Sequence, residues 1–149
     1  MAATYLSLHF HLIFGTKDRL PMIERDWRDR LHAFMGGILR EMNAIPESIG
    51  GVADHVHILA GLRATHRLSD ILHDVKKSSS AWVHGELKHS KFAWQAGYAA
   101  LTVSPSQIES VKNYVEQQEQ HHRHRTFQEE YLDLLLKAGI EFDSRQVWG

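Results

Sequence analysis

The alternation of apolar and polar positions is clearest in residues 4–14. Every even-numbered position from Leu6 onward is apolar, whereas the odd-numbered positions include Ser7, His9 and His11. Side chains alternate between the two faces of a β-strand, so one face of this segment is fully apolar. The segment is therefore predicted to be a strand that packs one face on the core.

Helical spacing of apolar residues follows in four segments: 24–42, 67–87, 104–122 and 127–137. Apolar residues that recur every three or four positions form one stripe on a helix. Ser104, Pro105 and Gln107 favour a capping-box start for the third helix. Gly139 is expected to end the last helix.

Residues 44–61 are predicted to form two short strands joined near Ala53 and Asp54, and residues 93–103 a further strand. The order β-α-β-β-α-β followed by helices predicts an α+β fold, the ferredoxin-like split β-α-β sandwich. Its antiparallel sheet would carry helices on one face, plus a C-terminal helix that bears Tyr114. The chain has 149 residues, 43% of them apolar, with no repeat or linker, which predicts a single domain over 1–149.

Composition narrows the function classes. A net charge of −1 argues against a protein that binds nucleic acid through overall basicity, so any site for a polyanion must be local. We expect no membrane partner and a cytoplasmic location, where DNA would be within reach, because neither a long apolar run nor a leader is present. The absence of cysteine excludes disulfides and thiolate metal sites, whereas 12 histidines draw attention to metal or phosphate chemistry.

The sequence DHVHIL places two histidines in an apolar strand. His55 and His57 point to the same face, where two imidazoles can converge on one metal ion. The alternative is a pair of histidines that only hydrogen bond to neighbours, and the pair alone does not decide between the two. Asp54 could orient a ligating histidine, but a turn at the start of the strand is the favoured role for it.

The sequence NYVEQQEQHH supplies a second motif. Tyr114 and Gln118 lie one helical turn apart, on one face of the predicted helix. Tyr114 lies at the border of the apolar stripe, so its hydroxyl can face a cleft. Taken alone, the tyrosine would be read as an amphipathic side chain at the edge of the core.

Together the two motifs resemble the single-tyrosine HUH transposases of bacterial insertion sequences. The resemblance extends to HFHLIFGTKDRLPMI, LSDILHDVKKSSSAWV, FAWQAGYAALTVS and FDSRQVWG, and so covers nearly the whole chain. It implies a metal-dependent endonuclease and strand transferase that cleaves and rejoins single-stranded DNA. The implied partners are DNA with hairpin ends and a second copy of the chain in a homodimer, in which the tyrosine helix can complete the site in trans.

The resemblance also implies roles for individual residues. His55 and His57 match the HUH metal ligands, Gln118 the third ligand, and Tyr114 the nucleophile that forms a 5'-phosphotyrosine link. The expected ion is Mg²⁺ or Mn²⁺, and mixed nitrogen and oxygen ligands are compatible with either. A cation would offset the charge that develops when a tyrosine attacks a phosphodiester.

Contacts with DNA phosphates are expected from basic residues near these motifs: Lys76, Lys77, His121, Arg123 and Arg125. Solvent-exposed charge explains each of them equally well.

Three other functions compete. A histidine-triad nucleotide hydrolase would need a third histidine where this chain has Leu59. A binding module of the same fold would present single-stranded nucleic acid on exposed sheet aromatics without a metal. A domesticated relative that cleaves repeated palindromes would share every catalytic residue, so the sequence separates it poorly from a transposase.

Overall fold

A computed structural model describes residues 2–149. Four strands form one sheet in the order β2-β3-β1-β4, and every neighbouring pair is antiparallel. The strands are β1 (His9–Gly15), β2 (Ile45–Val52), β3 (His55–Gly61) and β4 (Ala99–Val103). This topology confirms the ferredoxin-like α+β fold that the sequence predicted. Within the described residues, no helix is both long and apolar enough to cross a membrane.

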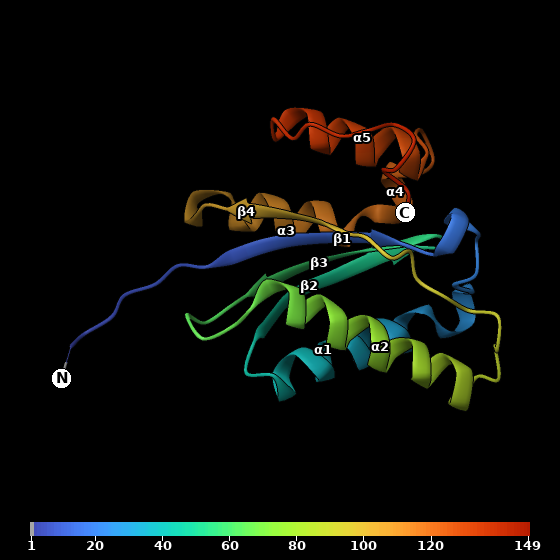
Figure 1. Ribbon diagram of the computed structural model, residues 1–149, viewed down its shortest axis with the longest axis horizontal. Coiled ribbons are helices and arrows are strands. Elements are labelled where there is room, and N and C mark those ends of the chain that lie inside the picture. The colour runs from blue at the N-terminus through green and yellow to red at the C-terminus, as the bar shows by residue number, and fades with distance from the viewer. Residues whose placement is uncertain (1) are drawn as a thin grey trace.

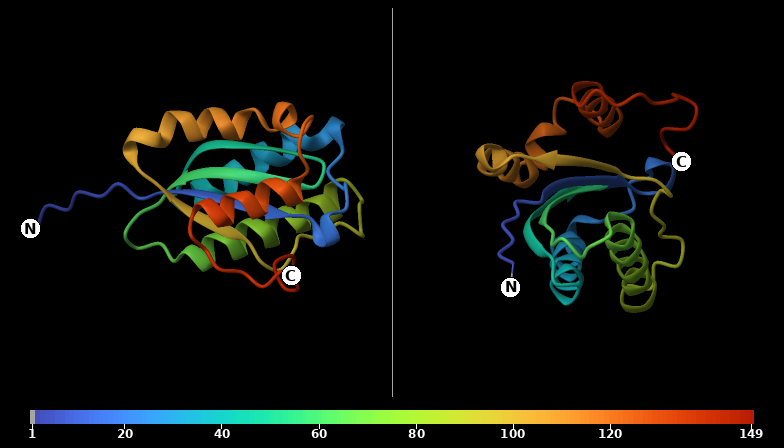
Figure 2. Two further views of the ribbon diagram at one scale, coloured as in Figure 1. Left: turned by 90° about the horizontal axis from the view of Figure 1, so that it is seen from above. Right: turned by 60° about the vertical axis from the view of Figure 1, so that its left-hand side comes forward.

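Helices cover both faces of the sheet (Figures 1 and 2). The first face packs against α1 (Arg25–Glu41) and α2 (Leu68–Glu86), which bury the apolar side of β1 and β3. On the second face lie α3 (Ile108–Glu116), the short α4 (Gln118–His121) and α5 (Phe127–Lys137). The second face also carries the polar side chains of the central strands, so it is the face on which a site can form.

Two predicted strands are shorter in the structure. The first begins at His9 instead of residue 4, because His9 pairs with the last residues of both neighbours, Gly61 and Val103. Residues 2–8 extend past the sheet, and Tyr5 there is 91% exposed. The strand predicted over 93–103 begins only at Ala99. Upstream of it, Trp94 forms only an isolated bridge with Thr16, and the ammonium group of Lys76 donates to the carbonyls of residues 95–97.

The predicted helix over 104–122 is divided. Residues Pro105–Gln107 form a 3-10 turn without a side-chain cap, so the capping box predicted at Ser104 is wrong. A second break falls at Gln117, between α3 and α4. There the side-chain amide of Gln118 donates to the carbonyl of Tyr114 at 3.1 Å, a carbonyl that the backbone of a continuous helix would use. The break therefore follows from the position of the Gln118 side chain.

Close contact between α3 and β2 depends on a glycine. A Cβ added to Gly50 would lie 2.0 Å from the carbonyl oxygen of Val115, far inside van der Waals contact. Backbone atoms cannot rotate away as a flexible side chain can, so only glycine allows α3 to lie at this depth on the sheet. The position of Tyr114, the neighbour of Val115, depends on the same contact.

We predict that Gly50→Ala destabilises the protein by about 1–3 kcal/mol, because α3 must move away from β2. Thermal unfolding measures the effect. Gly37→Ala in α1 is the matched control, since nothing lies within 4 Å of its added Cβ. Alanine there should raise stability by up to about 1 kcal/mol. Equal melting temperatures for Gly50→Ala and wild type would contradict the close contact.

Candidate metal and nucleophile site

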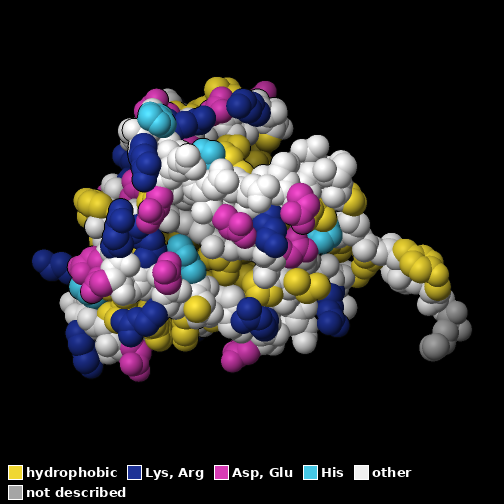
Figure 3. Space-filling model, turned by 180° about the vertical axis from the view of Figure 1, so that it is seen from behind, with side chains coloured by type: hydrophobic (Ala, Val, Ile, Leu, Met, Phe, Trp, Pro, Cys, Tyr) yellow, Lys and Arg dark blue, Asp and Glu magenta, His cyan; other side chains and the backbone are white. Residues whose placement is uncertain are grey.

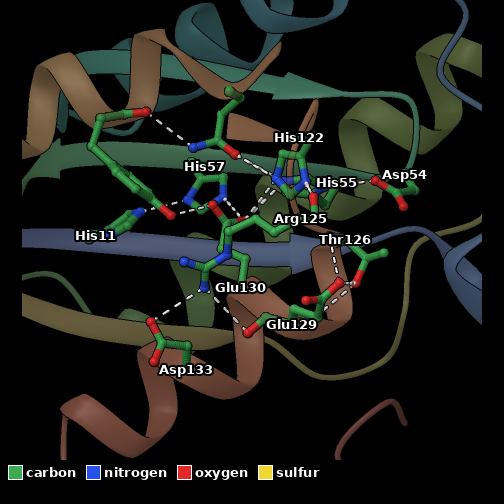
Figure 4. Close-up of polar contacts among 12 residues, drawn as sticks. His11, Asp54, His55, His57, His122, Arg125, Thr126, Glu129, Glu130 and Asp133 are labelled. Carbon is green, nitrogen blue, oxygen red and sulfur yellow. Dashed lines mark hydrogen bonds and ion pairs between the residues drawn. The ribbon is translucent and has the colours of Figure 1, made fainter. Parts of the chain in front are cut away.

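A buried carboxylate lies at the centre of the site on the second face (Figure 4). Glu130 of α5 is fully buried. Its oxygen Oε1 lies 2.9 Å from Nε2 of His57, 3.2 Å from Nε2 of His122 and 3.3 Å from Nε2 of His55. The carboxylate thus connects β3, the residue that follows α4, and α5. Burial opposes its ionisation, but contact with the three imidazoles outweighs burial and lowers the pKa of Glu130.

Two stacked histidines form one side of the site. His57 on β3 and His11 on β1 are both buried, and Nδ1 of His57 lies 2.7 Å from Nε2 of His11. Burial lowers the pKa of His57 to about 4 and that of His11 to about 3, so both rings are neutral near neutral pH. Because Glu130 accepts from Nε2 of His57, His11 donates to Nδ1. His57 would become a metal ligand if its hydrogen moved to Nδ1, with His11 as the acceptor.

His55 is oriented by the aspartate that precedes it. Its Nδ1 lies 2.8 Å from the carboxylate of Asp54, and its ring stacks on Phe127 of α5. Burial favours the neutral ring, but hydrogen bonds to Asp54 and Glu130 prevail and raise the pKa of His55. This contact supports the orienting role considered for Asp54, and Asp54 also lies in the turn between β2 and β3, the role favoured from the sequence.

The amide of Gln118 faces the same point. Its Nε2 donates to the carbonyl of Tyr114, which directs Oε1 toward the histidines. That oxygen lies 3.1 Å from Nε2 of His55 and 3.2 Å from Nε2 of His122. Gln118 is 1% exposed, so the orientation of its amide is set by protein groups and not by solvent.

Tyr114 reaches the cluster from α3. Its hydroxyl donates a hydrogen bond to Oε2 of Glu130, and its ring meets those of His57 and His11 edge-on. Burial and the negative charge of Glu130 both raise the pKa of Tyr114. In this arrangement the hydroxyl keeps its proton near neutral pH.

The structure brings together the four residues singled out from the sequence: His55, His57, Tyr114 and Gln118. All four lie in one chain. Sequence analysis missed Glu130 and did not assign His11 or His122 to the site. A signal for Glu130 existed, because it lies on the apolar face of α5 with the buried residues Phe127 and Tyr131.

The spacing of the donor atoms fits a divalent cation. Neighbouring ligands of an octahedral ion with bonds near 2.1 Å lie about 3 Å apart. The Nε2 atoms of His55 and His122 lie 3.1–3.3 Å from the oxygens of Gln118 and Glu130. One ligand atom from each of His55, His122 and Glu130 lies within 4.8 Å of the others. Imidazole, amide and carboxylate ligands together are suited to Mn²⁺ or Mg²⁺.

Among the predicted phosphate contacts, Arg123 directly follows His122 in the chain. It lines two adjoining grooves, with volumes of about 580 and 660 Å³, that border Gln118 and His122. Arg125 lines the larger groove together with Arg25 and Arg28 of α1. Figure 3 shows cationic, acidic and histidine side chains intermingled at the end of the molecule opposite the N-terminal segment.

The other predicted phosphate contacts have different surroundings. The ring of His121 stacks on Tyr114. Lys76 and Lys77 lie on α2, which covers the opposite face of the sheet. The ammonium group of Lys76 donates to three carbonyls, and its burial lowers its pKa to about 8, whereas Lys77 is exposed.

Comparison with protein families finds a match. The family described as "Transposase IS200 like" matches residues 4–118, which include His55, His57, Tyr114 and Gln118. A search of curated proteins finds no match.

Two solved structures share the fold. A candidate transposase from Deinococcus radiodurans R1 is 23% identical, with a TM-score of 0.66 over 79% of this chain and 95% of that chain. A REP-associated tyrosine transposase bound to a REP hairpin is 11% identical, with a TM-score of 0.57 over 77% of this chain and 68% of that chain.

A histidine in the smaller groove beside Gln118 should make the stability of the protein depend on pH. His32 lines this groove, and burial lowers its pKa from 6.5 to about 4, with Asp29 opposing and Arg28 assisting the shift. The unfolded chain therefore binds a proton at higher pH than the folded chain does. Between pH 6.5 and about 4, acidification favours unfolding through His32.

His32→Gln should remove this contribution. We expect its melting temperature to fall less than that of wild type between about pH 7 and about pH 4.5, by roughly 3 °C. His73→Gln is the control, because His73 has a 68% exposed side chain and should leave the pH profile unchanged. Parallel profiles for His32→Gln and wild type would show that His32 is not held in its neutral form.

Proposed function

The chain belongs to the family of IS200-like transposases, and we propose that it cleaves and rejoins single-stranded DNA through a covalent link to Tyr114. The observation that carries the proposal is the hydroxyl of Tyr114 beside a cluster of imidazole, amide and carboxylate donors within one chain. A nucleophile next to a set of metal ligands is the arrangement that metal-assisted phosphoryl transfer requires.

In the proposed reaction, the oxygen of Tyr114 attacks a DNA phosphorus. A 5'-phosphotyrosine bond forms, and the bond from phosphorus to the 3'-oxygen breaks. A later attack by a 3'-hydroxyl reverses these steps and releases Tyr114, so no nucleotide cofactor is consumed. Mg²⁺ or Mn²⁺ held by His55, His57 and Gln118 would stabilise the charge that develops on the phosphate.

The DNA substrate is proposed to be a single strand with hairpin ends. The REP-associated transposase of similar fold was solved with a REP hairpin, which supports a hairpin for this chain as well. The two grooves beside the site offer Arg123 and Arg125 to phosphates. Lys76, Lys77 and His121 remain predicted contacts from the sequence.

The metal and nucleophile cluster favours catalysis over the binding-module alternative. A module that binds bases on its sheet needs one open sheet face, whereas α1 and α2 cover one face here and α3 and α5 the other. The cluster serves a transposase and a domesticated palindrome endonuclease equally well, and the substrate would distinguish them.

The proposal includes a homodimer. Because Gln118 meets His55 and Tyr114 meets His57 within the same chain, each subunit would hold a complete site in cis. Mixing Tyr114→Phe with His57→Ala tests this point. An active mixture of two inactive variants would mean that the site is shared in trans.

Incubation with single-stranded hairpin DNA and Mn²⁺ tests the reaction. Wild type should give a covalent protein–DNA adduct on a denaturing gel, whereas Tyr114→Phe should give none because it lacks the attacking oxygen. Tyr131→Phe is the matched control, since Tyr131 is a buried core residue of α5 and should leave the adduct intact. An adduct of the same yield from Tyr114→Phe would remove Tyr114 from the role of nucleophile.

Arg123→Gln tests whether the DNA backbone lies in the two grooves that Arg123 lines. If Arg123 contacts a phosphate, the variant should bind hairpin DNA with a single-stranded flank more weakly. The slope of log K against log salt should fall by about 0.7, the value for one single-strand phosphate. Fluorescence anisotropy at several salt concentrations measures both the affinity for DNA and its dependence on salt. Lys91→Gln, an exposed lysine that lines neither groove, should match wild type.

A further inference from the structure

We infer that Glu130 and His122 bind the same divalent cation as His55 and Gln118, and that Glu130 also holds the nucleophile Tyr114. The inference rests on the proposed function and extends its metal site into α4 and α5. The family match ends at residue 118, so both residues lie beyond the matched segment.

The first argument concerns the hydrogens on two imidazoles. Nδ1 of His55 lies 2.8 Å from the carboxylate of Asp54, and Nδ1 of His122 lies 2.8 Å from the backbone carbonyl of Arg125. An ionised carboxylate and a carbonyl can only accept, so each Nδ1 carries the hydrogen. In neutral rings, both Nε2 atoms then present a lone pair.

The second argument concerns what these lone pairs face. Nε2 of His55 and Nε2 of His122 both point at Oε1 of Gln118 and Oε1 of Glu130, at 3.1–3.3 Å. Gln118 cannot relieve the contact by turning its amide, because its Nε2 donates to the carbonyl of Tyr114. Four lone pairs therefore converge on one point. Such an arrangement is repulsive unless a metal cation or a proton lies among them.

The third argument concerns charge. Neutral imidazoles and an amide bind a cation through dipoles alone, whereas the buried carboxylate of Glu130 adds a full negative charge next to them. Mg²⁺ and Mn²⁺ prefer oxygen ligands and carboxylates in particular. Because Coulomb attraction scales with charge, the carboxylate of Glu130 attracts a divalent ion more strongly than a single proton shared among the histidines.

The second oxygen of Glu130 gives the residue another role. While Oε1 faces the histidines, Oε2 accepts the hydrogen bond from the Tyr114 hydroxyl. One carboxylate therefore connects the ion site to the attacking oxygen. Helix α5 would act as the element that sets the distance between the nucleophile and the metal.

Titration with Mn²⁺, followed by isothermal calorimetry, tests the inference without DNA. Glu130→Gln keeps the shape of the side chain but removes its charge, and should raise the Kd for Mn²⁺ by about 10–100-fold. Glu129→Gln is the matched control one residue away. Glu129 is exposed, and a glutamine also serves as the third residue of the capping box with Thr126, so its Kd should equal that of wild type.

A second variant keeps the inference testable if Glu130→Gln does not fold. If Glu130→Gln does not give a cooperative unfolding transition in EDTA, His122→Gln replaces it, because the side chain of His122 is 10% exposed and lies outside the core clusters. It should also raise the Kd, whereas His124→Gln, an exposed neighbour, should not. An unchanged Kd in folded Glu130→Gln or His122→Gln would overturn the inference, as would tighter binding.

Two further results separate this inference from the proposed function. If wild type forms the Tyr114 adduct and binds Mn²⁺, but Glu130→Gln binds the ion equally well, the function stands and the inference fails. If Glu130→Gln weakens Mn²⁺ binding but wild type forms no adduct on hairpin DNA, the ligand set stands and the assigned reaction fails.

Discussion

The buried carboxylate of Glu130 is the group on which the rest of the site depends. A charge without access to water costs several kcal/mol unless donors surround it. Here the donors are His57 on β3 and Tyr114 on α3, and His122 after α4 contacts the same carboxylate. Helix α5 can therefore pack on the sheet only when the other three elements are in place, and they in turn lose a shared acceptor without it. The site and the second helical layer form together.

The sheet supplies the rigid side of this arrangement. His11 and His57 are neighbours across the pair β1 and β3, whose register places both rings on the face opposite the main core. Gly50 on the edge strand lets α3 approach closely enough for Tyr114 to reach Glu130. The charge of Glu130 connects the sheet to α3. The carboxylate would attract a cation, and without one its negative charge raises the pKa of Tyr114, the proposed nucleophile.

Most of the helices and four of the site residues could be predicted from the sequence, because periodic and local patterns are strong there. The apolar stripes predicted the helices closely, and the last helix spans the predicted residues 127–137. His55, His57, Tyr114 and Gln118 were found because each motif is local. Glu130 was missed because its partners are distant in the chain and an acid beside Glu129 looks like a solvated charge. The break at Gln117 was equally hidden, since it depends on where one amide side chain points.

The order of the elements along the chain has a consequence during synthesis. Both motifs leave the ribosome before α5 does, so a nascent chain already contains the histidines, Tyr114 and Gln118 while Glu130 is still absent. At that stage the tyrosine lacks the carboxylate that holds it over β3. The proposed site would thus be complete only after α5 has folded back onto the sheet.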